Sequence, residues 1–535
     1  GFIAVEHSGG AGKADQYFLR GFDADHGTDV AFFADGMPIN LRSHAHGQGY
    51  TDLNFIIPET IDGLDVYKGA YLPEYGDFST AGAVNFRTRE VVKEGVVQSA
   101  GGQFHTQRHL LMVSPTTDRV RSLIAAEGYY TNGPFEHDNR YFRGNLLGKA
   151  TMNPSARSEL SVTGTFHKSQ WNASGEIPLR AVQDGSLDRF GAVDPSEGGR
   201  TMRSTGRLNY HYDTTSGGRF FANAYAQYYR FDLFTNFTFF QNDPFNGDGF
   251  QQSDRRIMYG GDIGYKQNGR WFDMDGAATV GVQSRVDHIH ARLGPQVLRN
   301  PLGSTSDTDI TEASYAPFFK LEVQPAPWMR LAGGVRSEVF TFDVRNRCQT
   351  CVTQPSGTAD SGLVLPKANL ILGPWLRTEF FLNYGEGYHS NDARSAVTPA
   401  ASPLARAKSY EVGLRSRPWG SDGIELTATV WALDMKQELV FVGDEGTTEI
   451  RGASRRRGME VGARGQVWGP VYFNGSITWT KAEFRNGDAI PLAPEVTAYG
   501  ALLLRWPEGF TSQLQATYLG VRPLTEDCSI RAPSW

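Results

Sequence analysis

The chain has 535 residues, a formal net charge of −6 and a pI near 6.1. This length exceeds what one ordinary hydrophobic core supports, so the chain forms several domains or one large barrel. The slightly acidic balance gives no reason to expect nucleic-acid binding. No apolar run reaches the roughly 18 residues of a helical membrane span. This excludes a helical membrane protein and leaves a membrane β-barrel open, because barrel strands are only half apolar.

Residues 1–92 alternate short apolar runs with glycine-rich and polar segments, a pattern typical of a compact domain of short strands and long loops. The notable motifs here are Leu19-Arg20-Gly21-Phe22, Asp35-Gly36-Met37-Pro38, IDGLDVYKG at 61–69, and Tyr75-Gly76 followed by AGAVN at 81–85. In this order and spacing they resemble the plug domain of TonB-dependent outer-membrane receptors. The resemblance implies a mixed α/β plug over residues 1–92. It also implies that the family's TonB box lies before residue 1 and is missing from this chain.

Long period-2 patterns begin at about residue 93 and recur to residue 535. In the segment 219–231 the even-numbered positions are mostly apolar, while Asn223 and Gln227 fall on the other face. The segments 376–384 and 424–432 alternate in a similar way. Such alternation over strands of about ten residues is typical of an all-β, antiparallel transmembrane barrel, with lipid outside and water or a plug inside. We therefore predict a barrel domain over 93–535.

The connections between these strands differ in length in a regular way. Short turns rich in proline or glycine, such as 153–156, 267–269 and 507–509, alternate with longer segments, such as 170–200, 232–254 and 287–311. Outer-membrane barrels have this asymmetry, with short periplasmic turns and long extracellular loops. We count about nineteen strands, whereas the resemblance implies about twenty-two in a complete barrel, so we expect the last strands to be missing. A soluble β-propeller or β-helix is the alternative for a strand-rich chain of this length. A propeller would show a repeat of about 40–50 residues, and we find none.

The resemblance also implies an electrostatic latch between the plug and the barrel. Its plug residues would be Arg20 and Lys68, and its barrel residues Glu411 and Glu460. The family usually has arginine at the position of Lys68, and lysine offers a point charge rather than a bidentate fork. Strand periodicity supports both glutamates independently, because the adjacent apolar positions face lipid, where a charge would cost about 2–4 kcal/mol. The alternative is that all four are ordinary charged residues of a wet lumen.

A histidine-containing segment, RSHAHGQ at 42–48, follows the second plug motif. The resemblance implies that this segment is an apical plug loop, which faces the external vestibule and contacts ligand. We therefore predict ligand contacts for Arg42, His44, His46 and Gln48, and for His26 in the neighbouring apical loop. The alternative is that these histidines only hydrogen-bond the local backbone. The His-x-His spacing without cysteine is weak evidence for a metal site, and we assign none.

Cys348 and Cys351 lie three positions apart in a predicted extracellular loop. Because the cell surface is oxidising, we predict a small loop disulfide between them. We find no nucleotide-binding loop, no nucleophile elbow and no carboxylate pair with a separate reason to be catalytic. The sequence therefore predicts neither an enzyme nor a resident cofactor.

The residues and the resemblance together predict a TonB-dependent transporter of the bacterial outer membrane, which is a monomer surrounded by outer-membrane lipid. The resemblance implies that TonB and its inner-membrane energising complex drive uptake of a scarce small-molecule ligand into the periplasm. The family's usual ligand is a ferric siderophore. Cobalamin, another metal chelate or a saccharide stays open, because ligand choice depends on loops that no motif here identifies. A surface receptor that mainly signals is the second hypothesis.

Overall fold

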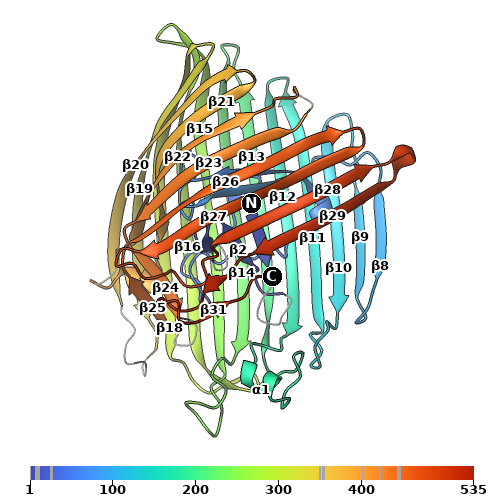
Figure 1. The fold of residues 1–535 in the computed structure, drawn as a ribbon, viewed down its shortest axis with the longest axis vertical. Coiled ribbons are helices and arrows are strands. Elements are labelled where there is room, and N and C mark those ends of the chain that lie inside the picture. The colour runs from blue at the N-terminus through green and yellow to red at the C-terminus, as the bar shows by residue number, and fades with distance from the viewer. Residues whose placement is uncertain are drawn as a thin grey trace.

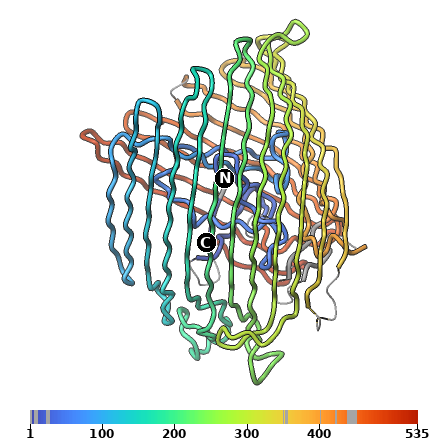
Figure 2. Tube along the Cα trace, turned by 180° about the vertical axis from the view of Figure 1, so that it is seen from behind, coloured from blue at the N-terminus to red at the C-terminus, as the bar shows by residue number. Residues whose placement is uncertain are grey.

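The computed structural model describes residues 2–5, 12–24, 28–348, 351, 356–399, 402–420, 423–442 and 447–535. These residues form a large β-barrel with a small domain inside it (Figure 1). Seen from behind, the N-terminal part of the trace is enclosed by the strands of the wall (Figure 2). The predicted fold class, a β-barrel filled by an N-terminal plug, is therefore confirmed.

The inner domain contains two small sheets. Its elements are β1 (Phe2–Val5), β2 (Gln16–Leu19), β3 (Phe22–Ala24), β4 (Val30–Ala34), β5 (Met37–Pro38), the 3-10 helix η2 (Pro58–Thr60), β6 (Ile61–Lys68) and β7 (Gly82–Thr88). Strands β1, β2 and β3 form one sheet, and the other has the order β5-β4-β7-β6, in which β4 and β7 are parallel. Buried Leu19, Phe32 and Val84 belong to one cluster that also includes Ala407 of the barrel wall. The core of the plug thus continues into the wall.

The barrel wall consists of long antiparallel strands. Its elements are β8 (Val96–Gly101), β9 (Gln107–Val113), β10 (Val120–Thr131), β11 (Tyr141–Ser155), β12 (Ser158–Asn172), β13 (Gly198–Asp213), β14 (Gly218–Thr235), β15 (Phe250–Trp271), β16 (Met274–Val297), β17 (Asn300–Pro301), β18 (Ser306–Ala326), β19 (Met329–Asn346), β20 (Gly357–Trp375), β21 (Thr378–Ser390), β22 (Leu404–Ser416), β23 (Glu425–Met435), β26 (Ser454–Trp468), β27 (Val471–Phe484), β28 (Val496–Arg505) and β29 (Thr511–Leu519). The shorter elements outside the wall are α1 (Leu179–Gln183), α2 (Ala393–Ala396), β24 (Glu438–Val442), β25 (Thr447–Arg451), η3 (Pro507–Gly509), β30 (Arg522–Pro523) and β31 (Arg531–Ala532).

Within the described residues, about nineteen long strands follow one another around a closed barrel in sequence order, with the two-residue β17 between β16 and β18 and the hairpin β24–β25 between β23 and β26. The two faces of each strand differ as the period-2 pattern predicts. On β14, Phe220 and Tyr228 are 50% and 42% exposed, whereas Gln227 is 2% exposed and faces inward. Apolar side chains therefore cover the outside of the wall, and polar side chains face the plug. Among the described residues, no helix is both long and apolar enough to cross a membrane.

The connections are short at one end of the barrel and longer at the other end, where α1 lies (Figure 1). Two predicted boundaries are wrong. The turn predicted at 267–269 lies inside β15, and the chain turns instead at Phe272 and Asp273, which both have positive φ. The loop predicted at 287–311 is mostly strand, because β16 extends to Val297 and β18 starts at Ser306. The charged residues in this stretch alternate along strands that extend past the apolar part of the wall.

Candidate functional site

The plug segment 42–48 lies against the barrel wall after β5 and is fixed at its first residue. The Arg42 guanidinium pairs with Asp77 of the plug at 2.7 Å and donates to the Ser314 hydroxyl of β18 at 3.1 Å. From β15, Arg256 Nη1 donates to the backbone carbonyl of Arg42 at 2.6 Å. This segment is therefore tied to the plug and to two separate parts of the wall.

His44 is fully buried in an aromatic environment. Its ring stacks on Tyr50 with 4.4 Å between centroids and 6° between planes, and its centroid lies 5.1 Å from that of Phe231. Its Nδ1 accepts a hydrogen bond from the backbone N–H of His46 at 3.1 Å. Burial, and then the nearby Arg256 guanidinium, hold the pKa of His44 well below its ordinary value of 6.5. The ring is therefore neutral at pH 7, with its proton on Nε2.

A connection of the barrel covers this plug segment. Gln48 Oε1 accepts a hydrogen bond from the backbone N–H of Asp392 at 2.8 Å, and the Ala393 N–H donates to the Ser43 hydroxyl at 2.7 Å. Asp392 and Ala393 belong to the β21–β22 connection that carries α2. The imidazole of His46 meets Gln252 of β15 at 2.7 Å.

The four described residues that we predicted to contact ligand are therefore buried in this conformation. The exposed fractions are 3%, 0%, 7% and 6% for Arg42, His44, His46 and Gln48, respectively. The sequence predicted a loop that faces an external vestibule, whereas the structure shows that loop beneath the β21–β22 connection. Ligand contact through these side chains requires that cover to move, and it stays a prediction. His26 lies outside the described residues.

The predicted latch residues meet inside the barrel. Arg20 Nη2 lies 2.6 Å from Glu411 Oε2, and Arg20 Nε lies 3.3 Å from Glu460 Oε2. Lys68 Nζ pairs with the other oxygen of Glu460. The side chains of Arg20 and both glutamates are only 6–7% exposed, whereas that of Lys68 is 30% exposed. One buried guanidinium thus bridges two strands of the wall.

Strand parity explains why both glutamates face the plug. Val412 on β22 and Met459 on β26 are 57% and 43% exposed on the outside, so their neighbours Glu411 and Glu460 face inward. On the plug, Arg20 has a φ of 50° and Gly21 a φ of 71°. A Cβ atom on Gly21 would lie 2.1 Å from the side chain of Thr480. A left-handed turn with a glycine therefore brings the backbone close enough for Arg20 to reach both carboxylates.

Sequence reasoning missed a second set of buried charges, which lies on the inner face of the wall against the plug. They form three pairs of opposite charges, and the two members of each pair are two positions apart on the inner face of the same strand. The pairs are Asp254 with Arg256 on β15, Arg285 with Asp287 on β16, and Arg336 with Glu338 on β19. Arg256 Nη2 and Asp254 Oδ2 are 2.6 Å apart, and both side chains have no exposed surface. The signal was present in the sequence, because opposite charges two positions apart on a strand must share a face.

Cys348 and Cys351 are joined by a disulfide between β19 and β20. In the described part of the chain, no group of three or more His, Cys, Asp or Glu side chains is arranged to hold a metal ion.

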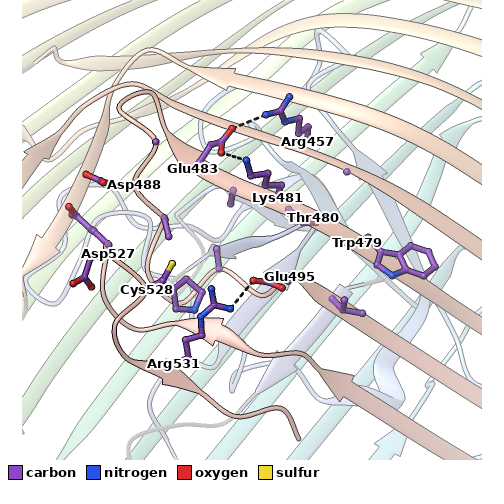
Figure 3. A pocket seen from close by; sticks show the side chains of 18 of the residues that line it. Arg457, Trp479, Thr480, Lys481, Glu483, Asp488, Glu495, Asp527, Cys528 and Arg531 are labelled. Atoms are coloured by element: carbon purple, nitrogen blue, oxygen red, sulfur yellow. Dashed lines mark hydrogen bonds and ion pairs between the residues drawn. The ribbon is translucent and has the colours of Figure 1, made fainter.

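A separate hollow of about 830 Å³ lies beside β26 and β27 and beneath the segment 523–531 (Figure 3). Its charged side chains pair with one another. Glu483 binds Arg457 at 2.8 Å and Lys481 at 2.5 Å, and Arg531 lies 3.2 Å from Glu495. None of the predicted site residues lines this hollow. The candidate site is therefore the covered plug segment together with the latch.

Two family models match the sequence. "TonB-dependent Receptor Plug Domain" matches residues 1–83, and "TonB dependent receptor-like, beta-barrel" matches residues 128–535. The chain belongs to the TonB-dependent receptor family. This receptor is thus an outer-membrane transporter of bacteria that works with TonB, and the prediction that it is not an enzyme is confirmed.

Solved structures share the whole architecture of this receptor. The unliganded ferric citrate transporter FecA has a TM-score of 0.85 and 17% identity, with 100% of this chain and 84% of that chain covered. The ferric yersiniabactin uptake receptor FyuA from Yersinia pestis has a TM-score of 0.80 and 15% identity, with coverage of 100% and 84%. The copper transporter OprC has a TM-score of 0.77 and 15% identity, with coverage of 100% and 86%. At these identities the likeness concerns the fold alone. No curated protein matches the chain.

Proposed function

We propose that this receptor binds a ferric siderophore at the covered end of its plug and carries it into the periplasm with energy from TonB. The observation that carries the proposal is the segment 42–48 beneath the β21–β22 connection. There Arg42 and Arg394, which pair with Asp77 and Asp392, lie near the neutral His44. Guanidinium and imidazole N–H groups suit the anionic, oxygen-rich surface of many ferric chelates. Solved proteins of the same fold include receptors whose titles name ferric citrate and ferric yersiniabactin.

The contacts within this segment rank the predicted ligand residues. Gln48 meets Asp392 of the β21–β22 connection, so it becomes available when that connection moves. His46 meets the side chain of Gln252 on β15, a contact that a ligand would replace. His44 stacks on Tyr50, and its Nδ1 accepts a hydrogen bond from the backbone, so this side chain positions the loop. We therefore propose that His46 and Gln48 contact the ligand directly and that Arg42 holds the loop.

We further propose that Arg20, Lys68, Glu411 and Glu460 act as the latch that keeps the plug in the barrel between transport cycles. We propose a domain boundary after residue 92, with a plug at 1–92 and a barrel at 93–535. The support is that β7 ends at Thr88 and β8 begins at Val96. The receptor would act as a monomer, with the inner-membrane energising complex acting through TonB.

Uptake by cells that express the full-length protein tests the ligand. The panel contains labelled ferric citrate, a ferric catecholate and a ferric hydroxamate, with cobalamin, a copper salt and an oligosaccharide as other classes. We expect one ferric chelate to enter only when TonB is active. TonB-dependent entry of another class alone would overturn the siderophore assignment. Tight binding without any uptake would favour the signalling receptor.

Substitutions then test the site with the ligand so identified. We expect His46→Ala and Gln48→Ala each to weaken its binding about tenfold or more, which corresponds to about 1.4 kcal/mol. The matched control is His288→Ala, because His288 is an exposed histidine on β16. Equal affinity of all three variants and the unmodified protein would remove His46 and Gln48 from the ligand site.

A further inference from the structure

The inward faces of three neighbouring strands, β12, β13 and β14, form a largely polar wall against the plug, in which Tyr225 and Phe231 are apolar members. Cross-strand register places Thr163 beside Arg207, His167 beside Arg203 and Arg203 beside Tyr229. The same register extends over five successive inward positions on each strand, from 161 to 169 on β12, from 209 to 201 on β13 and from 223 to 231 on β14. At the usual rise of a strand, this polar column is about 27 Å long. Because barrel strands tilt by about 35–45°, the column spans about 20 Å along the membrane normal, or about two thirds of the hydrocarbon core of about 30 Å.

Each of the five inward positions, taken across the three strands, contains a buried polar atom without a hydrogen-bond partner. From the extracellular to the periplasmic end, these atoms are Ser169 Oγ and Thr201 Oγ1; His167 Nε2, Arg203 Nη2 and Tyr229 Oη; Gln227 Nε2 and Oε1; Thr163 Oγ1 and Arg207 Nε; and Asn209 Oδ1 and Asn223 Oδ1. Buried polar groups are normally paired with protein or with ordered water. A run of them along the column indicates a surface that suits water or a polar solute rather than the plug.

The plug surface that faces the middle of the column is largely apolar. A cavity of about 50 Å³ lies between them, with plug residues such as Met37, Ile39 and Phe55 on one side and Thr163 and Gln227 on the other. This volume has room for about three water molecules. Apolar side chains cannot satisfy these polar atoms, so the plug adheres less well in the middle of the interface than at its extracellular end, where Leu41 and Tyr50 belong to one buried cluster with Phe231. We call this interface between the plug and β12–β14 the seam.

Arg207 ties the wall to the plug near the periplasmic end of the seam, where its Nη1 donates to the carbonyls of Ala34 and Asp35 at 3.0 and 2.6 Å and lies 3.3 Å from the Asp35 carboxylate. At the extracellular end the column reaches the candidate ligand site, because the His44 ring centroid lies 5.1 Å from that of Phe231 and 5.8 Å from that of Tyr229. The seam therefore leads from the covered plug segment toward the periplasmic side of the wall.

Other parts of the wall also hold the plug by direct polar bonds, as Arg207 does at the periplasmic end of the seam. The latch pairs Arg20 with the carboxylates of β22 and β26. On β18, Lys320 pairs with Glu74 of the plug at 2.9 Å, and on β20, Lys367 donates to the carbonyl of Ala70 at 2.7 Å. Charge-assisted bonds of this kind are stronger than apolar contact with an unsatisfied polar surface.

We propose that the solute crosses this receptor along the seam, where the plug separates from β12–β14 while its other side stays attached to the wall. The side chains of the column, Thr163 and Gln227 among them, would line the route and replace part of the solute's hydration shell. This inference rests on the transporter class of the chain and does not depend on the ligand proposed above.

Cysteine accessibility in cells that express the full-length protein tests the route. The variant Thr163→Cys places a thiol at the seam, and the matched control Ala316→Cys places one on β18, on the wall that Lys320 ties to the plug. Both positions are buried, at 8% and 2% exposure, and both replacements change the side-chain volume little. The background carries Cys528→Ser, since Cys528 is the free cysteine and Cys348 and Cys351 are bonded. The probe is a small cationic methanethiosulfonate added outside the cells.

We expect energised cells with TonB to modify Thr163→Cys at least tenfold faster than the same cells treated with a protonophore, while Ala316→Cys changes less than twofold. Equal acceleration at both positions, faster modification of Ala316→Cys, or no TonB-dependent change at Thr163→Cys would overturn the route. Uptake of the ferric chelates in the same variants separates the two proposals. Uptake without faster modification overturns the route alone, whereas faster modification without uptake of any ferric chelate supports the route and overturns the ligand.

Discussion

Replacement of Arg20 by glutamine should release the plug more than any change at Lys68. Arg20 lies between Glu411 and Glu460, with all three side chains 6–7% exposed. Its loss leaves Glu411 buried with a hydrogen bond from Asn383 at 3.0 Å but without its cation. Removal of one partner of a buried ion pair typically costs about 3–5 kcal/mol. With about 1.4 kcal/mol for each factor of ten, the detached state of the plug should become at least a hundredfold more populated.

The smaller effect expected at Lys68 follows from the greater exposure of its side chain. The side chain of Lys68 is 30% exposed, and Glu460 keeps Arg20 when Lys68 is replaced. Exposed ion pairs are worth about 0–1 kcal/mol, so Lys68→Gln should change the detached population by a factor of about five or less.

Hydrogen exchange of the purified full-length protein in detergent measures this difference, with peptides from β2–β7 as the readout and peptides from the barrel as the internal reference. A rescue variant makes the test sharper. Glu411→Gln in the Arg20→Gln background removes the uncompensated buried charge, so it should slow plug exchange again by at least tenfold. Plug exchange in Arg20→Gln within threefold of the unmodified protein would refute the reasoning, as would a larger effect of Lys68→Gln than of Arg20→Gln.

Three further changes test other parts of the structure. Gly21→Ala should speed plug exchange at least tenfold, because its φ is +71° and a Cβ would lie 2.1 Å from Thr480, while Gly128→Ala, with nothing within 4 Å of its Cβ, should change it less than twofold. Because burial holds the native pKa of His44 below the ordinary 6.5, stability should fall below pH 6.5 by up to about 1.4 kcal/mol per unit. His44→Gln should reduce that slope in thermal unfolding between pH 6.5 and 5, and an unchanged slope would contradict the assignment. Burial also raises the pKa of Glu197 to about 8, so its contribution to stability should decrease as pH rises from 4.5 to 8. Relative to the unmodified protein, Glu197→Gln should therefore slow tryptic cleavage within 173–197 at pH 8 but not at pH 5. Cleavage of the variant and the unmodified protein at the same rate at both pH values would count against a neutral buried carboxyl.

The sequence alone was enough for the features that depend on local geometry. Side chains on a strand alternate with a period of two whatever the strand packs against, so the inward register of Glu411 and Glu460 could be read from their apolar neighbours. The plug motifs required no knowledge of the barrel either, because they occur in one continuous stretch. The predicted strand ends were less accurate, because the stretch 287–311 was predicted as a loop, whereas cross-strand pairing places most of it in β16 and β18.

The tertiary structure decided which faces meet. Arg20 and Glu460 are 440 positions apart, and no sequence period relates them. The burial of His44 under the β21–β22 connection depends on residues that follow it by about 350 positions. The seam likewise exists only because an apolar plug surface lies against polar β12–β14. Strand periodicity determines whether a side chain faces in or out, but closure of the wall around the plug determines which groups an inward side chain contacts. For that reason the latch could be predicted from family motifs, whereas the covered site and the seam could not.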